Sequence, residues 1–196
     1  MIIWLNGPFG GGKTTTARLL HQQLPTSLIT DPEEVGFLLR KSIGDHPTRQ
    51  KDFQDYPAWR TLVAGVCTEL ERQTQGGPII APMTLLRREY AEEIFDALAK
   101  AGVEVDHLLL HADSDTIQAR IDSSMEFPDS EERSEKVREF RRRKLAEYER
   151  SCLMKSFESR RRSRTAFSCW ESPEVTSSWP VASVRISRRI CRSWTA

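Results

Sequence analysis

The stretch GPFGGGKT, residues 7–14, lies between an apolar run at residues 1–5 and a segment with helical periodicity. It satisfies the pattern G-x-x-x-x-G-K-[ST] in the strand-to-helix context that a phosphate-binding loop requires. The glycines allow successive backbone N–H groups to face one anion, and the N-terminus of the following helix adds a partial positive charge. The alternative is a glycine-rich turn with an exposed lysine, but the complete pattern and its flanks favour a phosphate loop.

Nucleotide and metal ligands follow from this pattern. We expect Lys13 to reach the β- and γ-phosphates of a nucleotide and the hydroxyl of Thr14 to bind Mg²⁺, so ATP and Mg²⁺ are the implied cofactors. The residues expected to hold the nucleotide are Gly7, Phe9, Gly10, Gly11, Gly12, Lys13, Thr14, Thr15 and Arg120.

The composition excludes several classes of protein. The 196 residues have a formal net charge of +1 and are 38% hydrophobic, which indicates one domain and neither a basic nucleic-acid binder nor a disordered chain. The four cysteines have no metal-ligand spacing, no signal peptide fits the first residues, and no apolar run approaches the roughly 20 residues that span a bilayer. We therefore expect reduced thiols in a cytoplasmic protein, with any membrane contact peripheral.

The pattern of apolar residues predicts strands at residues 1–5, 27–30, 78–81 and 104–112, each followed by a segment with helical periodicity. Such alternation predicts an α/β fold of the P-loop small-kinase type, in which a parallel sheet has helices on both faces. Residues 44–55 are expected to form a loop. In the helix after residue 57, the predicted buried stripe is Trp59, Leu62, Val63, Val66 and Leu70.

A lid is expected after the fourth strand and its helix. Residues 123–135 are polar with little apolar anchorage, so we expect a mobile segment before a charged helix at about residues 136–150. Arg120 is placed to reach the nucleotide, and Arg141, in a run with Arg142 and Arg143, is expected to approach the phosphates when the lid closes. The alternative is that these arginines form a solvated helix face.

Asp31 is the candidate acid of the site. It follows the second predicted strand, where an open parallel sheet presents residues to ligands. It is expected to accept a proton from a substrate hydroxyl or to help hold Mg²⁺. The alternative is a helix cap before Pro32. The third strand is followed by Pro82, Met83 and Thr84 and lacks the usual metal-binding carboxylate.

The segment KDFQDYPAWR, residues 51–60, concentrates three aromatic residues and an arginine. Phe53 and Tyr56 lie outside the predicted helical stripe, so either they stack on a base or sugar or they pack in the core. Trp59 lies on the stripe and is expected in the core. Arg60 is included in the expected substrate site.

These residues together resemble the tunicamycin-resistance proteins, which are relatives of small P-loop kinases such as chloramphenicol phosphotransferase and gluconate or shikimate kinase. The matching stretches are MIIWLNGPFGGGKT, TDPEEVGF around Asp31, KDFQDYPAWR, PMT at residues 82–84 and QARID around Arg120. The resemblance implies an ATP-binding protein that protects a bacterium from tunicamycin. It also implies a drug or UDP-sugar-like ligand near Asp31 and residues 53–60, to which we add Met83 and Thr84.

The last 41 residues differ from the rest of the chain in charge and in amino-acid composition. Residues 1–155 carry 21 Lys+Arg against 25 Asp+Glu, a net charge of −4, whereas residues 156–196 carry 8 against 3, a net charge of +5. The second segment has ten serines and no lysine or aspartate. We hypothesise a kinase-like domain at residues 1–155 followed by a frame-altered tail, in which residues 181–186 retain the pattern of a strand.

Three functions are consistent with the sequence. The first is an ATP-dependent phosphotransferase that acts on a hydroxyl of tunicamycin or a related sugar-nucleoside. The second is a binding protein in which ATP shapes a site that sequesters the drug without turnover. The third is a metabolic kinase for a sugar acid or nucleoside, which would leave the aromatic segment unexplained.

Overall fold

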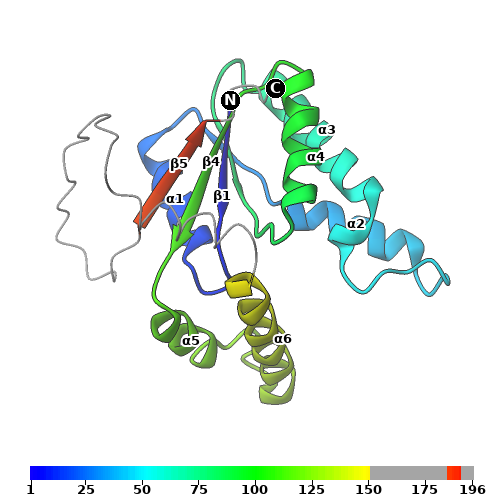
Figure 1. Cartoon of the computed structure of the whole chain (residues 1–196), viewed down its shortest axis with the longest axis vertical. Coiled ribbons are helices and arrows are strands. Elements are labelled where there is room, and N and C mark those ends of the chain that lie inside the picture. The colour runs from blue at the N-terminus through cyan, green and yellow to red at the C-terminus, as the bar shows by residue number, and fades with distance from the viewer. Residues whose placement is uncertain (151–184, 191–196) are drawn as a thin grey trace.

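Five strands form one sheet in the order β2-β3-β1-β4-β5, in a computed structural model that describes residues 1–150 and 185–190 (Figure 1). Strands β1 to β4 are parallel, as predicted, and β5 is antiparallel to β4. The elements are β1 (Ile2–Asn6), α1 (Lys13–Gln23), β2 (Leu28–Ile29), α2 (Pro32–Ile43), the 3₁₀ turn η1 (Phe53–Asp55), α3 (Pro57–Gln73), β3 (Ile79–Pro82), α4 (Arg88–Lys100), β4 (Val105–His111), α5 (Ser114–Asp122), α6 (Glu131–Arg150) and β5 (Arg185–Ile190).

The alternating side chains of β1 create the two layers that cover the sheet. Ile2 and Trp4 belong to a core cluster with residues of α3 and α4, whereas Ile3 and Leu5 pack in a second cluster with Ala17 of α1. This alternation is the two-residue period of a strand whose two faces are both buried. The predicted α/β fold, with helices on both faces of a largely parallel sheet, is confirmed.

Helix α3 buries a different stripe from the predicted one. Leu62 and Val66 are 43% and 40% exposed, although the sequence pattern placed both in the core. The buried face instead runs through Trp59, Val63 and Cys67, and it includes the charged residue Arg60. The prediction of Leu62 and Val66 as core residues is wrong, because the packing of α2 and α4 against α3 decides which side of the helix faces inward.

The segment that connects α5 to α6 is shorter than the predicted lid. Helix α6 begins at Glu131, so only residues 123–130 remain between the helices. Ser134 fixes this segment, since its hydroxyl donates to the carbonyl oxygen of Phe127 and accepts from the N–H of Phe127, both at 3.0 Å. Both helices lie beyond the end of the sheet toward which β4 points (Figure 1).

The predicted tail lies largely outside the described residues. Within it, the structure describes β5 at Arg185–Ile190, which overlaps the strand pattern expected at residues 181–186 by two residues. Along the described part of the chain, no helix combines the length and apolar character needed to cross a membrane.

Candidate functional site

The loop between β1 and α1 has the backbone conformation that its glycines predict. Gly12 is the N-cap of α1 with φ 87°, and Gly7 has φ 152°. A Cβ atom on Gly7 would lie 2.7 Å from the carbonyl oxygen of Leu110, which no real side chain permits. Glycine is therefore required at residue 7 by a close contact with β4 and at residue 12 by the left-handed conformation.

Lys13 is a half-buried cation held by carbonyl oxygens. Its ammonium group donates hydrogen bonds to the carbonyl oxygens of Gly7 and Pro8, both at 3.0 Å, and lies 5.3 Å from the centre of the Phe9 ring. No carboxylate among the described residues lies within 4.0 Å of it. Burial lowers the pKa of Lys13 from its ordinary value of 10.5 to about 8. A desolvated cation at the mouth of a glycine loop fits a phosphate group.

Uncharged, buried hydrogen bonds join this loop to the segment after β3. The side-chain oxygen of Asn6 accepts from the N–H groups of Gly7, at 2.8 Å, and Leu85, at 2.9 Å. The hydroxyl of Thr84 donates to the carbonyl oxygen of Gly7 at 2.8 Å. Met83 is buried, and its carbonyl oxygen accepts from the indole of Trp4. Thr84, which the sequence assigned to substrate, therefore supports the phosphate loop, whereas Met83, assigned in the same way, is held against Trp4 of β1.

Two carboxylates lie near Lys13 at the start of α2. Asp31 caps this helix, because its side chain accepts from the N–H of Glu33 at 2.9 Å. The helix-cap alternative is thus observed, and Asp31 remains exposed beside the site. Burial, followed by the charge of Asp31, raises the pKa of Glu33, against the opposing charges of Lys13 and Arg141. Glu33 was not predicted as a site residue, because acidic residues in a first helical turn are common.

The residues available to a magnesium ion fit a site completed by the nucleotide. Thr14 and Asp31, the predicted metal ligands, are both exposed near the phosphate loop. In the residues described, no group of three or more His, Cys, Asp or Glu side chains is arranged to hold a metal ion. Mg²⁺ commonly takes one or two protein ligands and completes its shell with water and phosphate oxygens. A hydroxyl and a carboxylate are the appropriate chemistry.

The two predicted arginines have different surroundings. Arg120 donates to the carbonyl oxygen of Gly10 at 3.2 Å, so α5 does bring it to the phosphate loop. Arg141 donates to the hydroxyl of Ser124 at 3.1 Å and pairs with Glu126 at 2.7 Å. It also acts electrostatically on Lys13 and Glu33, which places its charge within reach of the same site.

The aromatic segment contributes its rings to the core. Phe53 packs against Trp59, with ring centres 5.3 Å apart, and the ring fills the space where a Cβ on Gly36 would lie. Tyr56 is buried and its hydroxyl accepts from the N–H of Gln50. Both rings therefore take the packing alternative, because α2 and α3 close over them. Arg60 is also buried, where it pairs with Glu93 at 2.5 Å.

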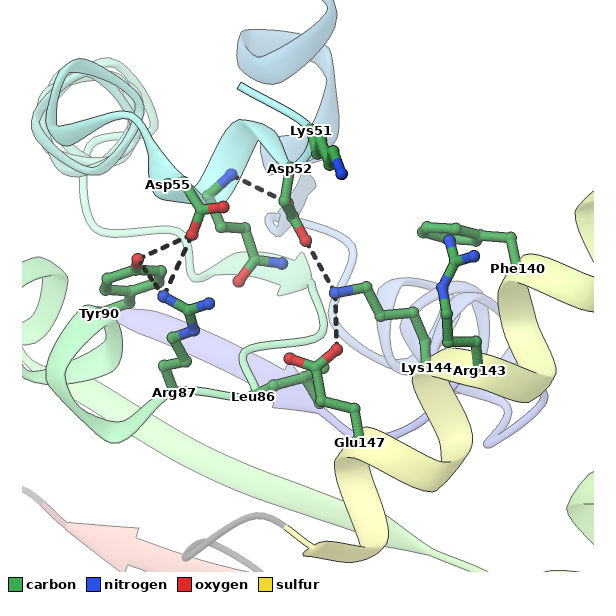
Figure 2. Close-up of a pocket in the computed structure, with 11 residues that line it drawn as sticks. Lys51, Asp52, Asp55, Leu86, Arg87, Tyr90, Phe140, Arg143, Lys144 and Glu147 are labelled. Carbon is green, nitrogen blue, oxygen red and sulfur yellow. Dashed lines mark hydrogen bonds and ion pairs between the residues drawn. The ribbon is translucent and has the colours of Figure 1, made fainter. Parts of the chain in front are cut away.

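A pocket of about 460 Å³ opens beside these buried rings (Figure 2). Its walls come from η1 and the two residues before it, the segment between β3 and α4, the first turn of α4 and one side of α6. Phe140 connects it to the phosphate loop by an edge-on contact with Phe9 at 5.7 Å. Gln54 makes a second connection, because its amide donates to the carbonyl oxygen of Thr84. The lining residues are Lys51, Asp52, Gln54, Asp55, Leu86, Arg87, Tyr90, Phe140, Arg143, Lys144 and Glu147.

Comparisons with known proteins show which family and which solved structures this chain resembles. A family model described as an AAA domain matches residues 2–152. The tunicamycin resistance protein of Deinococcus radiodurans is 32% identical, with 70% of this chain and 78% of that protein covered at a TM-score of 0.55. A sugar kinase from a Janibacter species shares the fold at 17% identity, with 74% and 76% covered and a TM-score of 0.50. No curated protein sequence matches significantly.

Proposed function

The chain belongs to the AAA-domain family of P-loop proteins, and from this premise we propose that it is an ATP-dependent phosphotransferase. It transfers the γ-phosphoryl group of Mg·ATP to a hydroxyl of tunicamycin or a related sugar-nucleoside. The observation that supports this most strongly is the half-buried ammonium of Lys13, which among the described residues contacts two carbonyl oxygens and the Phe9 ring and forms no ion pair. The 32% identity to a tunicamycin resistance protein suggests the acceptor.

In this proposal each part of the site has a separate task. The N–H groups of residues 10–15 and the ammonium of Lys13 hold the β- and γ-phosphates, while Arg120 stabilises the loop at Gly10. Thr14 would hold Mg²⁺, with Asp31 binding a water molecule of the metal's shell, and the bound metal would neutralise charge on the phosphates. The free oxygen of Asp31 takes the proton from the attacking hydroxyl. The pocket between η1 and α6 holds the acceptor.

One observation favours a second function, the sequestration of the drug without turnover. The segment after β3 supplies Met83 and Thr84, both buried and uncharged, where a nucleotide-hydrolysing P-loop protein commonly has a metal-binding carboxylate. If Asp31 serves only as the cap of α2, nucleotide would bind and chemistry would be absent.

Product analysis separates the two functions. We expect the protein, incubated with Mg·ATP and tunicamycin, to yield a product heavier by one phosphate group together with ADP. Asp31→Asn should lower turnover by roughly 10² to 10⁴ while nucleotide and drug still bind, because that is the usual effect of removing a positioned base. Glu34→Gln, an exposed change in the same helical turn, is the matched control and should retain turnover.

Two outcomes would contradict the proposed roles. Tight binding of tunicamycin with no phosphorylated product, even from the unmutated protein, would replace the transferase by a sequestering protein. Turnover by Asp31→Asn equal to that of Glu34→Gln would remove Asp31 from the chemistry and leave it as the helix cap.

A further inference from the structure

Three cationic side chains gather at the phosphate loop. Lys13 belongs to the loop, Arg120 donates to one of its carbonyl oxygens, and Arg141 of α6 acts electrostatically on Lys13. Helix α6 contacts the loop directly beside Arg141, because the rings of Phe9 and Phe140 meet edge-on with their centres 5.7 Å apart. A nucleotide whose phosphates lie in this loop therefore meets three positive charges.

Arg141 is the one cation of these three that has a carboxylate partner among the described residues. Its Nη2 atom donates to a carboxylate oxygen of Glu126 at 2.7 Å, and its Nη1 atom donates to the hydroxyl of Ser124 at 3.1 Å. Lys13 and Arg120 instead donate to backbone carbonyl oxygens. A guanidinium binds phosphate oxygens through such pairs of N–H groups, so Glu126 occupies a position that suits a phosphate oxygen.

The two partners of Arg141 differ in how firmly they are held. The hydroxyl of Ser124 donates to the carbonyl oxygen of Ile121 in α5 at 2.7 Å, and its carbonyl oxygen accepts from Arg138 at 2.9 Å. The side chain of Glu126 is 49% exposed, and in the described part of the chain Arg141 is its one ion-pair partner. Partly exposed ion pairs are weak and compete with other ions. Glu126 is therefore the partner that Arg141 can exchange.

We propose that Glu126 holds Arg141 while the phosphate loop is empty and competes with the nucleotide for it. When the nucleotide binds, the guanidinium exchanges the carboxylate of Glu126 for an oxygen of the β- or γ-phosphate. Glu126 is thus an autoinhibitory residue that lowers the affinity of the site for nucleotide. This rests on the part of the proposed function that places the phosphates of ATP at Lys13, and it is independent of the transfer step.

A double-mutant cycle of nucleotide affinity tests this exchange. In titration calorimetry with Mg²⁺ and the non-hydrolysable ATP analogue AMPPNP, Glu126→Gln should bind about two- to fivefold more tightly than the unmutated protein, the range expected of a partly exposed ion pair. Arg141→Gln should weaken binding about tenfold, because a charge-assisted hydrogen bond to phosphate is lost. In the Arg141→Gln background, Glu126→Gln should bring no gain, because no guanidinium remains to be released.

Asp129→Asn separates this competition from a general effect of charge. Asp129 lies in the same connecting segment between α5 and α6, and its partner is Arg133 at 3.9 Å. The variant changes the net charge by the same amount as Glu126→Gln and leaves Arg141 paired. We therefore expect Asp129→Asn to bind AMPPNP with the affinity of the unmutated protein.

Three results would overturn the proposal. The first is an AMPPNP affinity that Glu126→Gln leaves unchanged or lowers, which would make Glu126 a support for Arg141. The second is an equal gain in Asp129→Asn, and the third is a gain that persists in the Arg141→Gln background; either would reduce the effect to net charge. Turnover is measured separately with tunicamycin. Absence of a phosphorylated product would refute the transferase and leave the competition intact, whereas any of the three binding results would do the reverse.

Discussion

The phosphate loop and helix α6 lie beside each other, yet different kinds of interaction hold them. The loop is fixed by uncharged, buried hydrogen bonds, of which Asn6 makes three, to the backbone of Gly7 and Leu85. Helix α6 is joined to its neighbours by ion pairs, such as Arg142 with Asp122 and Lys144 with Asp52, and by two buried side chains, Leu145 and Tyr148.

The two kinds of interaction respond differently to salt and to bound ligands. Buried, neutral hydrogen bonds are insensitive to salt, and breaking one of them leaves an unsatisfied group at full cost. Exposed ion pairs are weak and screened by salt, and they exchange partners easily. We therefore expect the phosphate loop to be preorganised and α6 to be the part that shifts more readily when charged ligands bind.

The largest expected effect is on stability, from Asn6→Ala. This change leaves the N–H groups of Gly7 and Leu85 without acceptors in a fully buried position, at about 1–3 kcal/mol each, so the free energy of unfolding should fall by roughly 2–6 kcal/mol. Urea denaturation measures it. Ser42→Ala, which removes an exposed hydrogen bond in α2, is the control. A loss below about 1 kcal/mol would show that the uncharged hydrogen bonds of Asn6 do not fix the phosphate loop.

The next effect is on transfer, from Lys13→Ala. Removing a contact to the developing charge should cost roughly 2–4 kcal/mol at the transition state, and nucleotide affinity should fall with it. The melting temperature should change little, because the change removes two hydrogen bonds to the carbonyl oxygens of Gly7 and Pro8 and a contact with the Phe9 ring, and no ion pair with a described residue. Lys41→Ala is the matched control. Unchanged nucleotide affinity in Lys13→Ala would refute the phosphate-loop assignment.

Nucleotide affinity should also depend on pH. Because burial lowers the pKa of Lys13 to about 8, the ammonium is lost above that pH and affinity for Mg·ATP should fall by up to about tenfold per pH unit. Lys13→Ala should show no such fall. The unfolded chain binds more protons between the pKa values of about 8 and 10.5, so this lysine makes the free energy of unfolding rise with pH across that window. Titration calorimetry at several pH values measures the nucleotide affinity. An affinity that stays constant up to pH 10 in the unmutated protein would contradict the prediction.

The smallest expected effect concerns the ion pair between α6 and the segment before η1. Asp52→Asn removes the ion pair that ties Lys144 of α6 to the segment before η1, and should cost at most about 1 kcal/mol of unfolding free energy. Amide exchange in residues 123–135 should nevertheless accelerate, and Mg·ATP should slow it again. Lys136→Gln, which breaks an exposed pair within α6, should leave that exchange unchanged. Slow exchange that is insensitive to nucleotide in every variant would show that α6 is fixed.

The predictable parts of the site are those that local sequence controls. Lys13 and the glycines stand where the motif places them, since the motif is itself a local geometry of turn and helix start. Asp31 lies between β2 and α2, where the strand and helix signals of the sequence place it. Arg120 lies on α5 and contacts Gly10. The start of this helix was predictable, because Asp113 and Ser114 are both typical N-cap residues, and Asp113 is the cap observed. Segments were predicted more reliably than individual side chains.

Residues that depend on neighbouring elements were not predictable in this way. Within residues 51–60, the sequence left open whether the aromatic side chains contact a ligand or pack in the core. The packing of α2 and α3 buries Phe53 and Tyr56 and leaves Lys51 and Asp52 at the pocket. The anchoring of residues 123–130 by Ser134 depends on hydrogen bonds within a polar segment, for which apolar periodicity provides no signal.

The sequence by itself determined the α/β order of elements and the phosphate loop, because both arise from interactions between residues close in the chain. Only the tertiary structure decided that Glu33 and Arg141 act on Lys13, and that α6 closes a pocket against η1. Those pairs are distant in sequence, and desolvation and Coulomb energies depend on distance in space.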